Sequence, residues 1–291
     1  MLSQNPRRPV RIDFPTSARP TQPMESSPVK AIIIGGAEDK ENDRAILATF
    51  FRAAGGARAR ILIIPTASGQ PDLLGEVYRV LFAQMGAQTV QVLNFTQRQQ
   101  ADEPEVEAIL ERATAIFMTG GDQVRLTTIL AHTRFNRVLH QLWQENRLLV
   151  GGTSAGASAM GSCMIAWGTS GAPPKRSIVQ LGTGMGLLPP LIIDQHFFNR
   201  NRLARLITAV AAYPTCLGLG IDENTAVMLF ADGTLEVIGE GSVTIVDGTK
   251  LSYSNAPQVD EDHPLSVCDL KLHILVKSAR YHLGRHEIMA T

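Results

Sequence analysis

Five consecutive residues, Gly152-Thr153-Ser154-Ala155-Gly156, fit the pattern G-x-S-x-G. Three large aliphatic residues precede them, and small residues follow. A serine on a sharp strand-to-helix turn has a strained backbone, so its neighbours must be small, and its hydroxyl is exposed. The amide of Ala155 would then face a developing oxyanion, with that of Gly121 as a second donor. The pattern indicates a nucleophilic serine, and the alternative is a tight turn whose serine only caps the next helix.

A nucleophilic serine needs a base, and histidine is the usual one. The chain has seven histidines, and only His196 ends a buried strand, expected over residues 191–196. The others lie in an expected helix, beside a proline or in the C-terminal tail: His132, His140, His263, His273, His282 and His286. We therefore expect His196 to act as the base of Ser154.

The acid that would orient His196 is less well defined by the sequence. Asp194 is the only acidic residue between Ser154 and His196, but its side chain would have to fold back along the strand. Asp222 and Glu223, after another apolar run, are the other candidates. All three alternatives stay open at this point.

Three arginines, Arg200, Arg202 and Arg205, follow His196 within nine residues. The simplest interpretation is a solvated basic face, but beside a catalytic histidine they could bind substrate carboxylates. Acidic residues at neighbouring strand ends would suit a cationic group; they are Asp122, Asp194, Asp222 and Glu223. Both signs of charge in one site predict a zwitterionic substrate.

Alternating strands and helices must position these residues. Continuous apolar runs predict strands over residues 31–34, 60–64, 89–93, 115–118 and 148–150, with helical patterns over 42–54, 73–85, 104–112 and 124–145 between them. This alternation indicates an α/β fold with a mostly parallel sheet covered by helices on both faces. Ligands of such sheets bind at the carboxyl ends of the strands. Four glycine-rich or polar segments follow strands at that edge: 35–40, 119–123, 152–156 and 194–196.

The C-terminal part has a different pattern. Asp232-Gly233 and Asp247-Gly248 each separate short alternating segments, which predicts hairpins. We expect these antiparallel strands to extend the same sheet, so that residues 29–291 form a single α/β domain with a helix over 201–212. Residues 1–28 carry six prolines among several arginines and are expected to be a flexible extension.

Composition limits the function. The chain has 291 residues with 27 basic and 27 acidic side chains, so no overall charge would attract nucleic acid or a membrane surface. The three cysteines are widely spaced and lack a C-x-x-C pair, which indicates a reducing compartment and no zinc site. We expect a cytoplasmic protein without a membrane span, a metal or an organic cofactor.

Longer strings resemble one family. The segments 35–40, 117–123, 152–157, 194–197 with 199–202, and 218–225 are similar to those of the cyanophycinases, serine-type exopeptidases of the peptidase E-like group. The similarity runs from about residue 30 to the C-terminus. It implies a class I glutamine amidotransferase-like fold, commonly dimeric, and cleavage of cyanophycin, a polyaspartate with arginine on each β-carboxyl group, into β-Asp-Arg dipeptides.

The resemblance also implies residue roles. Ser154 would be the nucleophile and His196 its base. The substrate groove would be lined by Gln123, Asp194, Gln195, Arg200, Arg202 and Arg205. No cofactor or metal is implied, and the partners would be the cyanophycin polymer and a second copy of the chain.

One position departs from the family pattern. A glutamate of the charge relay is expected directly after a Ser-Gly pair, but Ala172 follows Ser170-Gly171 here. Alanine can neither accept a hydrogen bond nor carry charge, so another group would have to orient His196. The interpretation that follows is a cyanophycinase-like serine hydrolase. The alternatives are an aspartyl or isoaspartyl dipeptidase of the same group, and a cyanophycin-binding homologue with impaired catalysis.

Overall fold

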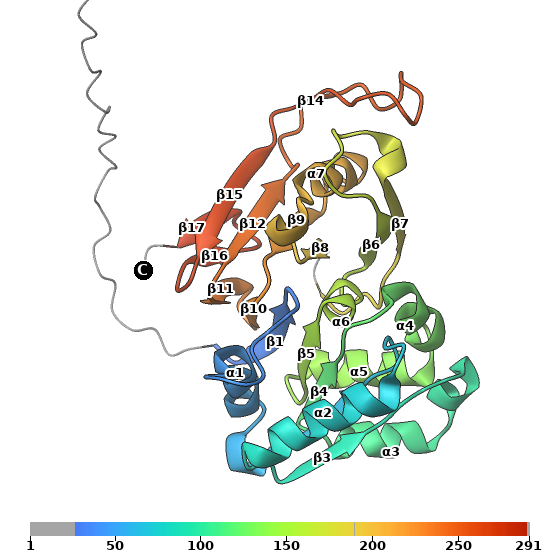
Figure 1. Cartoon of the computed structure of the whole chain (residues 1–291), viewed down its shortest axis with the longest axis vertical. Coiled ribbons are helices and arrows are strands. Elements are labelled where there is room, and N and C mark those ends of the chain that lie inside the picture. The colour runs from blue at the N-terminus through green and yellow to red at the C-terminus, as the bar shows by residue number, and fades with distance from the viewer. Residues whose placement is uncertain (1–26, 189, 290–291) are drawn as a thin grey trace, which may run out of the picture.

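Five parallel strands form one end of the larger of two main sheets (Figure 1). The computed structural model of the chain describes residues 27–188 and 190–289. The nine-stranded sheet has the order β17-β16-β11-β10-β1-β5-β4-β2-β3. Its parallel members are β1 (Val29–Ile34), β2 (Arg60–Ile64), β3 (Thr89–Val92), β4 (Ala115–Met118) and β5 (Leu149–Thr153). The predicted α/β class with a mostly parallel central sheet is confirmed.

Helices cover both faces of this sheet. On one face, α1 (Ala45–Ala53) and α2 (Pro71–Gln84) pack aromatic residues against the strands; Phe50 and Phe82 both contact Phe117 of β4. The opposite face carries α3 (Glu105–Arg112), α4 (Gln123–Leu130), α5 (Arg134–Gln144) and α6 (Ala155–Ser158). Alternate residues of β1, β2, β4 and β5 enter the two apolar clusters, which is why these four strands do not alternate between apolar and polar residues, whereas the edge strand β3 contributes only Val90 and Val92 to one cluster.

Antiparallel strands from the C-terminal part extend the sheet beyond β1, as the sequence predicts. They are β10 (Thr225–Phe230), β11 (Thr234–Gly239), β16 (Arg280–His282) and β17 (Glu287–Met289). Asp232-Gly233 forms the tight turn between β10 and β11, with Gly233 at φ 84°. This part of the hairpin prediction is confirmed.

The prediction that the whole tail joins one sheet is wrong. A second sheet of order β15-β12-β9-β8 packs beside the first, and its inward side chains join the same apolar cluster as α3–α6. Its strands are β8 (Leu191–Gln195), β9 (Leu217–Ile221), β12 (Ser242–Asp247) and β15 (Lys271–Val276), and α7 (Leu203–Ala212) covers its outer face. The chain changes sheet at corners near Asn224 and Gly239, both in the left-handed region with φ 46° and 99°. Short alternating strands do not reveal such corners.

Three further details differ from the sequence-based expectations. The helix expected over residues 124–145 is divided into α4 and α5, because Thr133 caps a new helix and His132 has a positive φ of 61°. The segment after Ser158 contains an unpredicted hairpin of β6 (Cys163–Gly168) and β7 (Val179–Thr183). The strands β12 and β15 pair antiparallel, but a long excursion with β13 (Tyr253–Ser254) and β14 (Val267–Cys268) separates them instead of a tight turn at Asp247-Gly248.

Residues 1–28 were expected to be a flexible extension. Of these, residues 1–26 lie outside the residues that the structure describes. The single domain over residues 29–291 stays a prediction. No helix in the described part of the chain is long and apolar enough to cross a membrane.

Candidate active site

Ser154 lies on the turn between β5 and α6. β5 ends at Thr153 and α6 begins at Ala155, and the serine between them has φ 52° and ψ −113°, a strained conformation for a residue with a side chain. The turn closes tightly, since a Cβ atom on Gly152 would lie 2.6 Å from the carbonyl oxygen of Gly156. The two glycines of the G-x-S-x-G pattern therefore permit a turn that presents the Ser154 hydroxyl.

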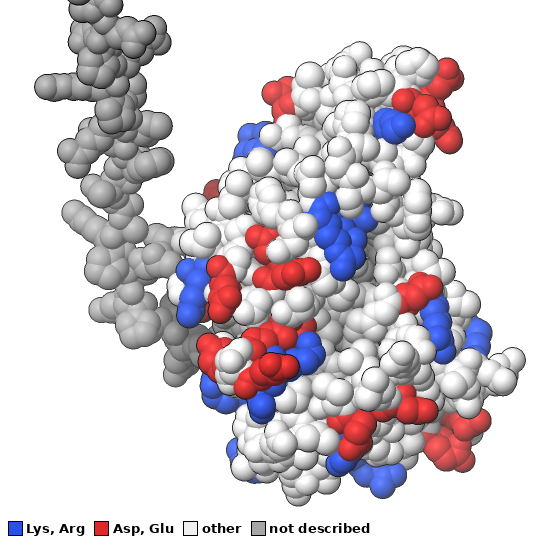
Figure 2. All heavy atoms as spheres, in the orientation of Figure 1, with Lys and Arg blue, Asp and Glu red and all other residues white. Residues whose placement is uncertain are grey.

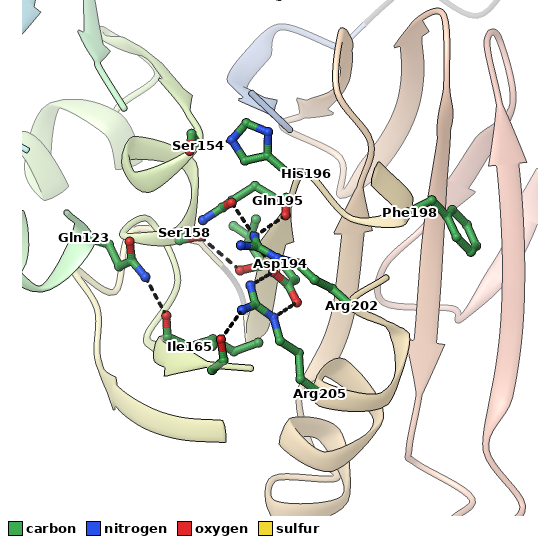
Figure 3. A network of polar contacts seen from close by, with 12 residues as sticks. Gln123, Ser154, Ser158, Ile165, Asp194, Gln195, His196, Phe198, Arg202 and Arg205 are labelled. Carbon is green, nitrogen blue, oxygen red and sulfur yellow. Dashed lines mark hydrogen bonds and ion pairs between the residues drawn. The ribbon is translucent and has the colours of Figure 1, made fainter. Parts of the chain in front are cut away.

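His196 approaches Ser154 from the second sheet. Its Nε2 lies 3.1 Å from Ser154 Oγ, within hydrogen-bonding distance (Figure 3). Its backbone amide donates to the carbonyl oxygen of Gly35 at 2.8 Å, and its ring lies on Gly36, where a Cβ atom would be only 2.4 Å from Cε1. Gly36 is therefore required for the close approach of the loop after β1 to the imidazole.

A carboxylate occupies the other side of the imidazole. Glu223 Oε1 lies 2.7 Å from His196 Nδ1. β8 and β9 are parallel neighbours with Gln195 opposite Ile221, so the residues that follow each strand meet at the same sheet edge. Asn199 Oδ1 accepts the backbone N–H of Glu223 at 3.0 Å and holds this turn. Of the three acids left open by the sequence, the one that contacts His196 is Glu223, so the alanine at residue 172 does not leave the imidazole without a carboxylate.

The environment of His196 favours the neutral form of its imidazole. Burial lowers its pKa from the usual 6.5, the positive charges of Arg200 and Arg202 lower it further, and the hydrogen bond to Glu223 opposes the shift. A neutral imidazole with Nδ1–H directed at the carboxylate leaves the Nε2 lone pair free to accept the serine proton. Ser154, His196 and Glu223 thus have the distances of a nucleophile, a base and an orienting acid.

The expected oxyanion donors lie beside Ser154. Ala155 is the first residue of α6, where backbone amides have no partner within the helix. On the facing turn a Cβ atom on Gly120 would be 3.4 Å from the Ser154 Cβ, and Gly121 follows with φ 142°. The two turns lie on either side of Ser154, and the oxyanion role of their amides stays a prediction.

A polar pocket of about 300 Å³ opens next to the serine. Its described lining includes Ser154, His196 and one wall from the β6–β7 hairpin. The lining consists of Gly121, Gln123, Ser154, Ile165, Ala166, Trp167, Gly168, Gln195, His196, Arg200, Arg202 and Arg205. The structure brings seven of the residues predicted to be catalytic or substrate-binding into this lining: Ser154, His196, Gln123, Gln195, Arg200, Arg202 and Arg205. Basic side chains gather near the middle of the face in Figure 2, in the region where Figure 1 draws β8 and α7.

Two of the arginines are buried and paired. Arg205 donates from Nε to Asp194 Oδ2 at 2.7 Å and from a second nitrogen to Oδ1, and both side chains are almost fully buried (Figure 3). Arg202 donates to Gln195 Oε1 at 2.7 Å and lies 3.5 Å from Asp194. Burial lowers the pKa of Arg202 to about 10, partly offset by Asp194. The interpretation as a solvated basic face therefore holds only for the exposed Arg200.

The acids that the sequence offered for a cationic substrate group are already engaged. Asp194 is 1% exposed between its two arginines. Asp222 accepts hydrogen bonds from Phe198 N, Ser242 N and Ser242 Oγ, and Asp122 caps α4 by accepting from Val124 N and Arg125 N. None of these three carboxylates lines the pocket among the described residues.

The hairpin wall of the pocket was not predicted from the sequence. Gln123 Nε2 donates to the carbonyl oxygens of both Ile165 and Ala166, at 3.0 and 3.1 Å. The β6–β7 register shifts between Ile165 and Trp167, and a bulge turns both carbonyls to one side. Trp167, at the rim of the pocket, stays 57% exposed.

A second missed feature lies behind the serine. Glu38 is 3% exposed, and it accepts hydrogen bonds from Tyr78 Oη and from Thr153 Oγ1, the latter at 2.6 Å, while Lys40 lies 3.0 Å away. Burial and the adjacent carboxylate raise the pKa of Tyr78 well above its usual value, so the tyrosine stays a donor. This cluster ties the loop under His196 to the residue before Ser154.

Candidate metal-binding clusters were sought among the described residues. No group of three or more His, Cys, Asp or Glu side chains in the described ranges 27–188 and 190–289 is placed to hold a metal ion.

An α/β sheet with serine, imidazole and carboxylate in hydrogen-bonding order at one edge has the arrangement of a serine hydrolase. The chain belongs to peptidase family S51, whose model matches residues 31–238. It is 47% identical to a cyanophycinase from Nostoc sp. over 265 residues, 91% of this chain and 89% of that protein. It is 50% identical to a cyanophycinase from Synechococcus elongatus over 256 residues, 88% of this chain and 79% of that protein. The resemblance stated from the sequence is confirmed.

A solved structure supports the fold. A peptidase from an acI-B1 Actinobacterium superposes with a TM-score of 0.61 and 21% sequence identity, covering 90% of this chain and 96% of that one. At this identity the likeness concerns the fold alone.

Proposed function

We propose that the chain is a serine exopeptidase that hydrolyses cyanophycin to β-Asp-Arg dipeptides. The observation that carries the proposal is a chain of two hydrogen-bonding contacts beside an arginine-lined pocket. Ser154 Oγ lies 3.1 Å from His196 Nε2, and His196 Nδ1 lies 2.7 Å from Glu223 Oε1. The similarity to proteins named cyanophycinase over about nine-tenths of the chain supplies the substrate.

The mechanism is acyl transfer in two halves. Ser154 Oγ attacks the backbone carbonyl carbon while His196 Nε2 takes the hydroxyl proton, and Glu223 stabilises the imidazolium that results. The amides of Ala155 and Gly121 bind the oxyanion. The C–N bond then breaks, His196 protonates the leaving amine, and a water activated by the same imidazole hydrolyses the acyl-enzyme.

Arginines of the pocket bind the carboxylates of the substrate. Arg200 is exposed at the pocket, and no ion-pair partner for it is found in the part of the chain that the structure describes. The buried Arg202 and Arg205 hold Gln195 and Asp194 in place behind it. A free carboxylate is the group that this lining attracts.

The binding-only alternative was based on Ala172, and the carboxylate of Glu223 at His196 removes that basis. The experiment that separates the remaining alternatives is incubation of purified cyanophycin, and separately of β-Asp-Arg dipeptide, with the enzyme. Release of dipeptides from the polymer with the dipeptide left intact supports the proposal. Cleavage of the dipeptide alone would instead identify a dipeptidase.

We also propose that the enzyme acts in the cytoplasm as a homodimer. The three cysteines are free, which favours a reducing compartment. β15 forms an edge of the second sheet and exposes Leu272, Ile274 and Val276 on one face, an apolar row that a second copy could cover. Sedimentation equilibrium of the native chain and of Ile274→Asp tests the dimer.

A further inference from the structure

The pocket beside Ser154 has one sign of charge. Its described lining contains three arginines and His196 but no carboxylate, since the nearby acids are engaged elsewhere. Asp194 is enclosed by Arg202 and Arg205, and Glu223 contacts His196. A carboxylate is attracted to this wall, whereas a guanidinium placed there would be repelled.

The proposed substrate carries both groups on one side chain. Each arginine of cyanophycin has a free α-carboxylate at one end and a guanidinium at the other. If the carboxylate lies against the arginine-lined wall, the guanidinium must extend to a surface without positive charge. The wall formed by the β6–β7 hairpin contributes no charged side chain to the pocket, and the Arg205 guanidinium that donates to its Gly168 carbonyl oxygen is neutralised by Asp194.

Trp167 is the aromatic residue of that wall. Its side chain is 57% exposed at the pocket, although burial of an indole is normally favourable. Its backbone is fixed by the bulge at Ala166 and by the bonds from Gln123 to the neighbouring carbonyls. The indole is therefore held at the rim by the main chain, with a free ring surface.

We propose that the face of Trp167 is the subsite for the guanidinium of the substrate and makes the enzyme specific for arginine. The inference rests on the proposed function and adds the residue that recognises the side chain. A planar guanidinium stacks on an indole and interacts with its π-electrons, and this contact contributes about 0.5–2 kcal/mol, or roughly 2- to 30-fold in affinity. A neutral side chain of the same shape gains only the stacking.

Binding measurements in the Ser154→Ala background test the subsite without turnover. The probes are a short β-Asp-Arg oligomer and the same oligomer with citrulline, the uncharged isostere of arginine. Affinity is measured by calorimetry and by tryptophan emission, since the chain has two tryptophans and Trp143 is engaged with Lys30. We expect the arginine oligomer to bind about 2- to 30-fold more tightly than the citrulline oligomer.

Trp167→Ala should make the affinities for the arginine and citrulline oligomers nearly equal and should abolish the change in tryptophan emission. Trp167→Phe should keep part of the preference for arginine. The matched control is Phe198→Ala, because Phe198 is 47% exposed near the site but points away from the pocket (Figure 3). It should keep the full preference. An unchanged arginine preference in folded Trp167→Ala overturns the subsite alone, provided that the enzyme with Ser154 cleaves the polymer. If the arginine oligomer neither binds nor is cleaved, the proposed function fails together with the subsite.

Discussion

Glu223 contacts Nδ1 of His196 because β8 and β9 are parallel neighbours whose ends meet at one edge. Its carboxylate fixes the tautomer of the imidazole and stabilises the imidazolium formed during attack. Glu223→Gln keeps the shape but loses the charge, so we expect kcat to fall by about 10⁴, as for the equivalent change in a serine protease triad. Steady-state rates of dipeptide release measure this loss.

Ala172→Glu is the control for Glu223→Gln. Because Nδ1 of His196 is already occupied by Glu223, a new glutamate at residue 172 should change kcat by less than about twofold. An increase in the Ala172→Glu rate, or full activity of Glu223→Gln, would contradict the role given to Glu223.

The pKa of His196 determines the acid side of the pH profile. His196 acts as a base only when neutral, and burial lowers its pKa below 6.5. We expect kcat/KM to fall as the pH drops through this lowered pKa, with the midpoint below 6.5. The bond to Glu223 raises the pKa, so Glu223→Gln should move the midpoint further toward acid. A midpoint above 6.5 in the parent enzyme, or a shift toward alkaline pH in the variant, would contradict this assignment.

At the scale of elements, β8 and α7 are joined by the buried pair of Asp194 and Arg205. The simplest interpretation of the sequence placed Arg205 on a solvated basic face, and the burial of its side chain corrects that interpretation. Arg205→Ala leaves Asp194 with only the longer contact to Arg202, so we expect the free energy of unfolding to fall by about 3 kcal/mol.

Arg200→Ala is the comparison for Arg205→Ala. The side chain of Arg200 is exposed, so Arg200→Ala should change the free energy of unfolding by less than about 0.5 kcal/mol, while KM for the polymer rises. Denaturant titrations and initial rates of both variants measure these effects. Equal stability of the two variants would show that the buried pair does not hold α7 to β8.

Across the whole molecule, the sequence predicted the parts that depend on local pattern. Strands that are apolar along their length and the G-x-S-x-G turn indicated the parallel core and Ser154, and His196 was found because it ends a buried strand. The second sheet was missed because its C-terminal strands are short and alternate like the antiparallel strands of the first sheet, and only their pairing assigns them to a separate sheet.

The partners of the acidic residues could not be predicted for the same reason. Asp194 and Glu223 both follow or end apolar strands, yet one is enclosed by arginines and the other contacts His196. These contacts depend on the register of β8 against β9 and on the position of α7. Trp167 and Glu38 gave no signal, since a bulge and a buried cluster leave no periodic pattern.

The most direct test of the serine mechanism is the rate of β-Asp-Arg release from purified cyanophycin by the parent enzyme and by Ser154→Ala. Removing the nucleophile should lower kcat by about 10⁶ while the circular dichroism spectrum and the thermal midpoint stay the same, because Ser154 makes its side-chain contact with His196 at an open pocket. Release of the dipeptide by folded Ser154→Ala at the rate of the parent would contradict the mechanism.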